Sequence, residues 1–256
     1  MRLDGKIALI TGASAGFGLA IAYEYAQAGA KLILVARRLD KLNEIAEKLK
    51  AEFKSEVYVS ELDVRSYEAV SNFYNNIPDD FKAIDILVNN AGLARGMETI
   101  DNGVLENWEE MIDTNVKGLL YVTRNVLPDM VKRNSGIVIN ISSIAGRDIY
   151  PKGNVYCASK AAAKMISQAI AVDLNGTNIR SCNIDPGLAE TEFSIVRFRG
   201  DAEKAKAVYN GLTPLYGKDI AEIALFVATR PEHVMIQDIM VTPTAQATPT
   251  IVTRKL

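Results

Sequence analysis

The sequence predicts a single-domain α/β protein, built on a doubly wound parallel sheet of about seven strands with helices on both faces. Short apolar runs rich in β-branched residues alternate along the chain with segments of helical periodicity, which is typical of strand–helix–strand units. The chain has 256 residues, of which 48% are hydrophobic and 23% charged, and this suits one large domain with a sizeable core. No linker, repeat or low-complexity block divides it, so one domain is expected over residues 1–256.

Strands and helices alternate regularly through the first half of the chain. The run KIALIT indicates a buried first strand, and Gly29 is placed to end the helix that follows. Leu39, Leu42, Ile45 and Leu49 recur at the spacing of one helix face. Strands are expected at 6–11 and 31–36 and within 56–64 and 84–92, with helices at 16–28, about 39–49 and 66–77.

The second half continues the alternation with one interruption. A long helix is expected at 107–133, with Pro128 bending it or shortening its end, then a strand at 136–142 and a long helix at 155–174. Two further strands, at 178–184 and 237–242, enclose a helix at 219–228. Residues 185–217 fit the alternation poorly and are expected to form a substrate-loop excursion at one end of the sheet. The Thr- and Pro-rich tail, about 242–256, is expected to be extended.

The composition argues against several classes of function. The formal net charge of −2 favours neither nucleic acid nor an anionic membrane as a partner. No long apolar run precedes the first glycines, so no signal peptide or membrane span is expected and the cytoplasm is the expected location. Cys157 and Cys182 lack the spacing of a zinc site, so no metal is expected and both thiols should be reduced. His233 is the only histidine and indicates a surface residue, which leaves Ser-His-Asp and Cys-His catalysis without support.

A glycine-rich turn, TGASAGFG, joins the first strand to the first helix. Gly12, Gly16 and Gly18 would let backbone N–H groups and the helix N-terminus approach a pyrophosphate, as in Rossmann-type dinucleotide sites. Their spacing differs from the common G-x-G-x-x-G, and a turn without a ligand is the alternative.

The end of the second strand distinguishes between two dinucleotides. A site for NAD places a carboxylate here, on the ribose 2′-hydroxyl. This chain has Ala36, Arg37 and Arg38 instead, and two guanidinium groups suit a 2′-phosphate. A solvated basic helix start is the alternative, but with the glycine turn the pattern favours NADP. Asp63 follows the third strand and is placed either to meet the adenine or to begin a helix.

Tyr156 and Lys160 stand four residues apart in YCASK and would leave one helix face a turn apart. A free phenol has a pKa of about 10. A cation about 4 Å away, at an effective dielectric of ~20, would favour the phenolate by on the order of 4 kcal/mol and lower that pKa by up to ~3 units. The tyrosine would then work as a general acid–base near neutral pH. Most isolated Tyr-x-x-x-Lys pairs are surface pairs, so this pair indicates a catalytic site only if other motifs accompany it.

Further motifs accompany the pair: TGASAGFG, LDV, NNAG, TNVKG, INISS and DPGLAET. With them the sequence resembles the short-chain dehydrogenase/reductase family over nearly its full length. The resemblance implies that Tyr156 is the general acid–base, that Lys160 lowers its pKa and holds the nicotinamide ribose, and that Ser143 bonds the substrate oxygen. It also implies that Asn115 keeps a water in the proton relay. Ser143 is preferred to Ser142 because the family places its serine thirteen residues before the tyrosine.

The resemblance implies a set of cofactor contacts as well. Asn90, Pro186, Gly187 and Thr191 would line the nicotinamide half, and Phe17, where the family often has isoleucine, would make a backbone contact only. The full expected cofactor set is Gly12, Ser14, Gly16, Phe17, Gly18, Arg37, Arg38, Asp63, Val64, Asn90, Tyr156, Lys160, Pro186, Gly187 and Thr191.

Within the family, the chain is most similar to NADP-dependent 3-hydroxy acid dehydrogenases, through WEEMIDTN, PGLAETEFSIVRFRGD and the proline after MVT. This implies hydride transfer between NADP and the 3-hydroxyl of small acids such as L-serine or L-allo-threonine, in a homotetramer. One alternative is an NADPH-dependent carbonyl or 3-oxoacyl reductase of the same family. Another is a non-catalytic dinucleotide-binding regulator, against which the complete set of Asn115, Ser143, Tyr156 and Lys160 argues.

A 3-hydroxy acid brings a negative charge close to the reacting carbon, and a partly closed site must meet that charge with a donor or a cation. Arginine suits a carboxylate because its fork matches two oxygens. Arg197 in VRFRGD is the first candidate, Arg147 just past Ser143 the second, and Arg95 after NNAG the third. For each of them the alternative is a solvated surface residue. With Ser143 and Tyr156, Arg197 and Arg147 make up the expected substrate contacts.

Overall fold

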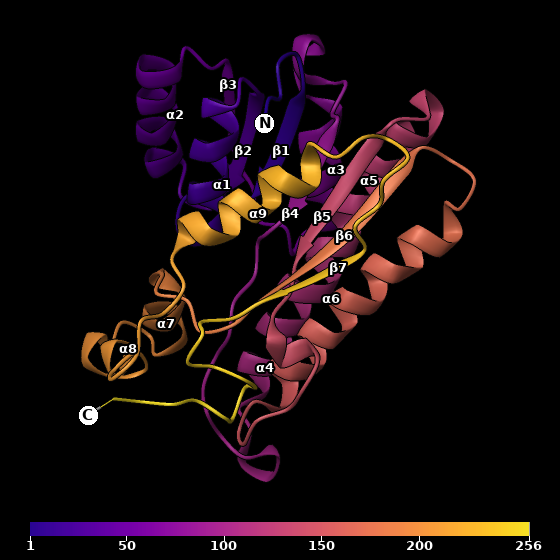
Figure 1. The fold of residues 1–256 in the computed structure, drawn as a ribbon. Coiled ribbons are helices and arrows are strands. Elements are labelled where there is room, and N and C mark those ends of the chain that lie inside the picture. The colour runs from indigo at the N-terminus through magenta and orange to yellow at the C-terminus, as the bar shows by residue number, and fades with distance from the viewer. Residues whose placement is uncertain (256) are drawn as a thin grey trace.

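Seven parallel strands form one sheet in the order β3-β2-β1-β4-β5-β6-β7 (Figure 1). The computed structural model describes residues 1–255, so Leu256, the end of the expected tail, lies outside the described residues. The strands are β1 (Ile7–Thr11), β2 (Lys31–Ala36), β3 (Val57–Glu61), β4 (Ile86–Asn89), β5 (Gly136–Ile141), β6 (Ile179–Pro186) and β7 (Asp238–Val241). The strand order reverses between β1 and β4, and ligands of such sheets bind beyond the carboxyl ends of the strands at that point.

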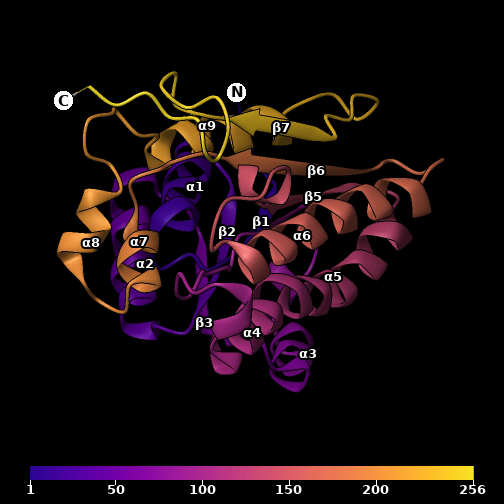
Figure 2. The same ribbon diagram turned by 90° about the horizontal axis from the view of Figure 1, so that it is seen from below.

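Helices cover both faces of the sheet (Figure 2). One face carries α1 (Gly16–Gln27), α2 (Leu39–Phe53) and α9 (Gly217–Ala228). The other carries α3 (Tyr67–Asn75), α5 (Leu119–Arg133) and α6 (Asn154–Asp173), with α4 (Leu105–Ile112) beside α6. Short 3₁₀ turns, η1 (Asp79–Phe81), η2 (Ile100–Asn102) and η4 (Ile144–Gly146), complete the connections.

The strands are buried on both sides, as a sheet covered on both faces requires. In β1, Ala8 and Ile10 pack toward α1 and α9, whereas Ile7 and Leu9 pack toward α3 and α5. This alternation divides the core into two layers, one on each side of the sheet. The prediction of a single-domain, Rossmann-type, doubly wound sheet is confirmed.

The helix expected at 107–133 changes its winding partway along. α4 ends at Ile112, a π-helical segment, η3 (Asp113–Gly118), follows, and α5 then runs to Arg133. Pro128 lies inside α5, so it does not shorten the helix. π-helical turns are rare and occur often at functional sites, and this one carries Asn115.

The expected excursion leaves the sheet later than the sequence indicated, because β6 continues through Pro186. It carries two short helices, α7 (Glu192–Arg197) and α8 (Ala202–Ala207), which lie to one side of the sheet (Figure 1). The tail bends back on itself where Gln246 pairs with Val252, and the Lys255 amide donates to the Gly211 carbonyl at 2.7 Å. The tail therefore rests on the end of the excursion. Within residues 1–255, the helices are all too short or too polar to cross a membrane.

Candidate active site

A cavity of about 540 Å³ opens beyond the carboxyl ends of the strands, where the strand order reverses. Most residues expected from the sequence line it: Gly12, Ser14, Gly16, Phe17, Arg37, Arg38, Asp63, Val64, Asn90, Ser143, Tyr156, Lys160, Pro186, Gly187, Thr191 and Arg197. Gly18 and Asn115 stand behind this lining. The described chain contains no group of three or more His, Cys, Asp or Glu side chains that could hold a metal ion.

The glycine turn is shaped by backbone geometry that only glycine adopts easily. Gly12 and Gly16 have φ values of 66° and 56°, in the left-handed region. A Cβ on Gly18 would lie 2.5 Å from Asn90 Nδ2 and 2.6 Å from the Gly12 carbonyl oxygen. The same Asn90 amide donates to the carbonyls of Thr11 and Gly12, at 2.8 and 3.2 Å. No side chain caps the first turn of α1, so its N–H groups face the cavity mouth as an anion site.

The two arginines after β2 lie at the end of the cavity nearest the glycine turn. Arg37 is exposed, whereas Arg38 donates from Nε and Nη2 to Ser14 Oγ, at 3.2 and 3.0 Å, and from Nη1 to Glu192 at 3.0 Å. Lys41 also approaches Glu192, at 3.7 Å. Two cations, Arg38 and Lys41, therefore meet one carboxylate next to the turn expected to hold a pyrophosphate.

Asp63 lines the same end of the cavity and is held by its neighbour. Arg65 donates to it from its backbone N–H and from its guanidinium, with N–O distances of 2.5 to 3.0 Å. These hydrogen bonds keep the pKa of the Asp63 carboxyl below its ordinary value, so the group is ionised at neutral pH.

Tyr156 is buried at the start of α6, with its ring 5.6 Å from that of Phe193 on α7. Burial raises the pKa of the Tyr156 phenol above its ordinary value. The hydrogen bond with Ser143 and the positive charge of Arg197 both lower this pKa, but they do not outweigh burial. Lys160 is not among the groups that shift this pKa, so the expected lowering by the lysine stays a prediction.

Lys160 is buried one turn further along α6. Its Nζ donates to the Ile141 carbonyl at 2.9 Å, and burial lowers the pKa of the ammonium to about 8. The negative charge of Asp185 acts in the opposite direction. A lysine in this position changes charge within the range where enzymes work.

Asn115 supports this centre from the π-helical segment. Its side-chain oxygen accepts from the Leu93 N–H at 2.8 Å, and its amide donates to the Leu93 carbonyl and to Ser159 Oγ, at 2.8 and 2.9 Å. A Cβ on Gly92 would lie 3.1 Å from Lys160 Nζ and 3.2 Å from Asn115 Oδ1, so the two side chains meet at this glycine.

Arg197 points into the cavity from the end of α7. Its guanidinium carbon lies 5.6 Å from the ring centre of Tyr150 and 5.8 Å from that of Tyr156. Nη2 donates to the Tyr150 hydroxyl at 3.0 Å. Sequence reasoning missed Tyr150, because nothing in its spacing from Tyr156 marks it as part of a site.

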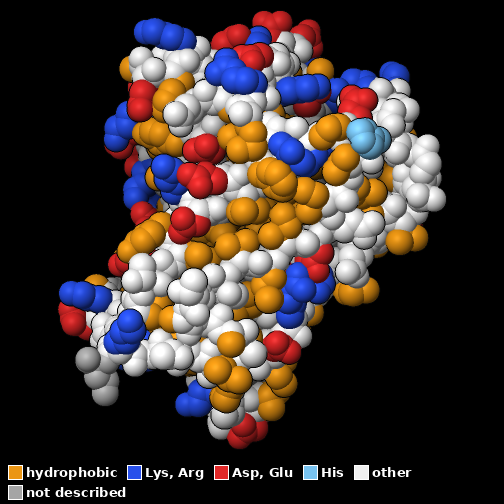
Figure 3. All heavy atoms as spheres, in the orientation of Figure 1, with side chains coloured by type: hydrophobic (Ala, Val, Ile, Leu, Met, Phe, Trp, Pro, Cys, Tyr) orange, Lys and Arg blue, Asp and Glu red, His pale blue; other side chains and the backbone are white. Residues whose placement is uncertain are grey.

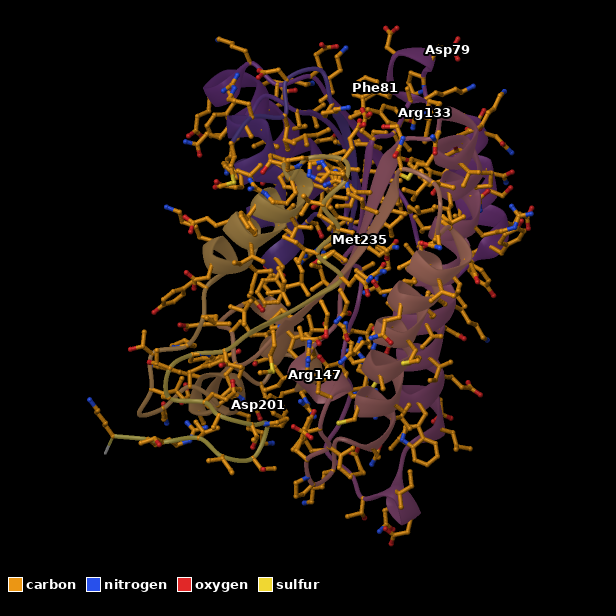
Figure 4. All side chains as sticks on the ribbon, turned by 45° about the vertical axis from the view of Figure 1, so that its right-hand side comes forward. Asp79, Phe81, Arg133, Arg147, Asp201 and Met235 are labelled. Atoms are coloured by element: carbon orange, nitrogen blue, oxygen red, sulfur yellow. The ribbon has the colours of Figure 1, made fainter. Side chains whose placement is uncertain are left out.

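Arg147 does not reach the cavity, and its assignment as a substrate residue is wrong. Its Nε donates to Asp185 at 2.6 Å and its Nη2 pairs with Asp238 at 2.5 Å. Figure 4, in which Arg147 is labelled, shows it between the sheet and the start of α6. Two carboxylates, Asp185 in β6 and Asp238 in β7, already bind the guanidinium, so it is not available to bind a substrate carboxylate.

Arg95, the third candidate, is also engaged elsewhere. It forms a two-pronged ion pair with Glu110, at 2.6 and 3.0 Å, and donates to the Val196 carbonyl at 2.5 Å. It therefore fastens α7 to α4, outside the cavity lining.

Comparison with known proteins agrees with this geometry. Residues 6–201 match the family model described as short chain dehydrogenase. The chain is 44% identical over 255 residues to the NADP-dependent 3-hydroxy acid dehydrogenase of Schizosaccharomyces pombe, covering 99% of this chain and 98% of that protein. It is 46% identical over 242 residues to the NADP-dependent 3-hydroxy acid dehydrogenase YdfG of Escherichia coli K12, covering 94% and 96% of the two chains.

Solved structures give the same result. The closed form of a serine dehydrogenase complexed with NADP⁺ has a TM-score of 0.91 and 44% sequence identity, covering 98% of this chain and all of that one. The serine dehydrogenase from Escherichia coli has a TM-score of 0.82 and 40% identity, covering 94% and 99% of the two chains. This protein belongs to the short-chain dehydrogenase family.

Proposed function

We propose that the chain is an NADP-dependent oxidoreductase that transfers hydride between its cofactor and the 3-hydroxyl of small 3-hydroxy acids, such as L-serine or L-allo-threonine. One observation carries this proposal: in a single cavity, which Ser143 also lines, the guanidinium of Arg197 stands 5.8 Å from the ring of a buried Tyr156. An acid–base group and a carboxylate receptor at this separation suit a molecule only a few atoms long. The similar proteins named 3-hydroxy acid dehydrogenase and serine dehydrogenase support the same reaction and substrate class.

The donors around the cavity fit NADP. Gly12, Gly16 and the open first turn of α1 would hold the pyrophosphate, and Arg37 and Arg38 the 2′-phosphate. The remaining residues of the expected cofactor set would hold the adenine and the nicotinamide ribose: Ser14, Phe17, Gly18, Asp63, Val64, Asn90, Tyr156, Lys160, Pro186, Gly187 and Thr191. When bound, the nicotinamide ring supplies or accepts the hydride.

Side chains of the protein would transfer the proton to and from the substrate oxygen. The raised pKa of Tyr156 keeps its phenol protonated at neutral pH, so it is ready to donate to a carbonyl oxygen during reduction. For oxidation the phenolate is required, and the charges of Lys160 and Arg197 would stabilise it. Ser143 would hold the same substrate oxygen by its hydroxyl, and Asn115 would keep the water that returns the proton to solvent.

The substrate carboxylate would meet Arg197, oriented by the Tyr150 hydroxyl. The acidic residues that line the cavity are Asp63 and Glu192, and both already pair with cations, Asp63 with Arg65 and Glu192 with Arg38 and Lys41. An α-ammonium group therefore has no partner of opposite charge near Tyr156, so we expect the enzyme to tolerate rather than require the amino group of serine.

A substrate panel tests the function directly. Turnover is followed by NADPH absorbance with L-serine, L-allo-threonine, 3-hydroxypropanoate, a simple ketone and a 3-oxoacyl thioester, each with the NADP and NAD forms of the cofactor. The acids should be turned over with NADP. Preference for the ketone or the thioester would identify a carbonyl or 3-oxoacyl reductase instead, and cofactor binding without any turnover would identify a regulator.

We also propose a homotetramer, supported by two exposed apolar surfaces. One lies on α4, α5 and α6, where Leu105, Leu120, Met165 and Val172 are exposed. The other lies on α9 and beside β7, with Phe226, Met235 and Met240, and Figure 3 shows apolar side chains gathered over it. Two self-complementary surfaces generate a closed tetramer with dihedral symmetry. Light scattering after gel filtration should give four times the mass of 28.0 kDa, and a monomer would exclude it.

The cytoplasm remains the proposed location, because the proposed cofactor is an intracellular dinucleotide. Cell fractionation with detection of NADPH turnover tests this, and activity confined to a membrane or secreted fraction would contradict it.

A further inference from the structure

Asp185 is a fully buried carboxylate at the end of β6, directly before the cofactor residues Pro186 and Gly187. Its two oxygens serve different partners. Oδ1 accepts from the backbone N–H of Ser143 at 3.2 Å, and Oδ2 accepts from Arg147 Nε at 2.6 Å. A buried carboxylate costs several kcal/mol unless it is paired and hydrogen-bonded, and these two contacts supply both the hydrogen bond and the opposite charge.

Arg147 is in turn anchored on the neighbouring strand. Its Nη2 pairs with Asp238 at 2.5 Å, and Asp238 also accepts from Asn183 at 2.9 Å and lies 3.5 Å from Lys164 Nζ. Asn183 and Asp238 are directly opposite each other in the sheet. The catalytic serine is thus tied through Asp185 and Arg147 to β7, the last strand of the sheet.

We propose that Asp185 is a positioning residue for the reaction: by holding the Ser143 amide on one side and Arg147 on the other, it fixes the serine hydroxyl against the phenol of Tyr156. This inference rests on the proposed function, in which Ser143 holds the reacting oxygen. Ser143 lies at the turn between β5 and η4, where its hydroxyl accepts from the Ala145 N–H at 3.1 Å. The Ser142 N–H donates to the Ile184 carbonyl at 2.8 Å and the Ser143 hydroxyl lies 3.5 Å from the Pro186 carbonyl, so this turn lies against β6. The Asp185 contact adds the one side-chain acceptor for the Ser143 N–H among the described residues.

The surroundings of Lys160 support the same role. Burial lowers the pKa of this ammonium, and the charge of Asp185 opposes the shift. One carboxylate therefore acts on two members of the expected catalytic set: it accepts a hydrogen bond from the serine N–H, and its charge favours the protonated form of the lysine.

The first test compares Asp185→Asn with Asp238→Asn. Both substitutions remove one buried or half-buried carboxylate partner of Arg147, but only the first disturbs Ser143. An asparagine side chain has one acceptor oxygen, so at position 185 its NH₂ group would face either the Ser143 N–H or Arg147, both of which are donors. Asp185→Asn should therefore lower kcat by about 10- to 100-fold, the effect of one charge-assisted hydrogen bond lost in the transition state. Asp238→Asn should keep kcat within about threefold. The Kd for NADPH, read from fluorescence, should stay within about threefold in both.

Two double variants keep the test valid if a single substitution prevents folding. The first combines Asp185→Asn with Arg147→Met, and the second combines Asp185→Ala with Arg147→Met. Neither leaves an unpaired charge buried at these two positions, but only the asparagine keeps an acceptor for the Ser143 N–H. The asparagine double variant should have about 10-fold the kcat of the alanine one, at similar melting temperature and NADPH affinity. Equal kcat in this pair, or equal losses in Asp185→Asn and Asp238→Asn, would overturn the inference.

The measurements use whichever substrate the wild-type enzyme turns over best. Failure of the proposed function would appear as absence of wild-type turnover on the acids. Failure of this inference would appear only as the wrong order among the variants.

Discussion

Replacing Arg197 by methionine separates binding of the substrate acid from the chemistry at its hydroxyl. Methionine keeps much of the length and the apolar stem and removes the charge. A charge-assisted hydrogen bond contributes about 1.5–3 kcal/mol, so losing the carboxylate receptor should reduce kcat/KM for the 3-hydroxy acid by about 10- to 150-fold.

The same arginine also acts on Tyr156, and the assay must remove that effect. At 5.8 Å from the ring centre, and at an effective dielectric of ~20, its charge favours the phenolate by at most about 3 kcal/mol. That contribution is common to every substrate at a given pH. The quantity to measure is therefore the ratio of kcat/KM for the acid to kcat/KM for an uncharged secondary alcohol, at one pH, in wild type and variant.

Arg199 provides the matched control, since it lies two residues further on and donates to Asn107 at 2.7 Å outside the cavity. Arg199→Met should leave the ratio within about twofold, whereas Arg197→Met should lower it at least ~10-fold. An unchanged ratio in Arg197→Met would refute the reasoning and assign the acid to backbone amides or hydroxyls.

The other predictions concern the cofactor, the lysine and the glycine turn. Arg37→Ala and Arg38→Ala should each raise the Kd for NADP by about 10-fold or more and change the Kd for NAD little, as measured by titration. Equal losses of affinity for both cofactors would contradict the assignment of these arginines to the 2′-phosphate. Because the pKa of Lys160 lies at about 8 in the folded chain and is higher when unfolded, the unfolded state binds more protons above that pH. Stability to urea should therefore rise from about pH 8 to 10, and Lys160→Met should flatten this rise; parallel pH profiles would exclude it. Gly18→Ala puts a methyl group 2.5 Å from Asn90 Nδ2, so it should lower stability by about 1–3 kcal/mol and weaken NADPH binding; calorimetry with unchanged values for both would contradict this.

Local patterns determine most of the fold, which is why the sequence predicted it well. Apolar runs that are buried on both faces, such as β1 and β5, are typical of parallel sheets, and the glycine turn marks the first crossover. The π-helical segment that carries Asn115 was not foreseen, because winding inside a helix depends on what packs against it. The two short helices of the excursion were also missed, since six-residue helices give too little periodicity to recognise.

The site was predictable where position along the chain determines position in space. Residues at strand ends and in the glycine turn reach the cavity as expected. Arg147 shows the limit of this reasoning: its place just after Ser143 suggested the substrate, but Asp185 and Asp238, 38 and 91 residues further along the chain, turn it toward the sheet. Tyr150 and Asp185 were missed for the same reason, because their importance depends on partners distant in sequence.

Tyr156→Phe tests the central claim most directly, since it removes only the hydroxyl that would exchange the proton. The variant is measured twice, for turnover with the best substrate of the panel and for NADPH binding by fluorescence. Turnover should fall by about 10²–10⁴-fold, the usual contribution of general acid–base catalysis, while the Kd for NADPH stays within about threefold. A variant that keeps more than about a tenth of wild-type kcat would contradict a catalytic role for this tyrosine and with it the mechanism proposed for the protein.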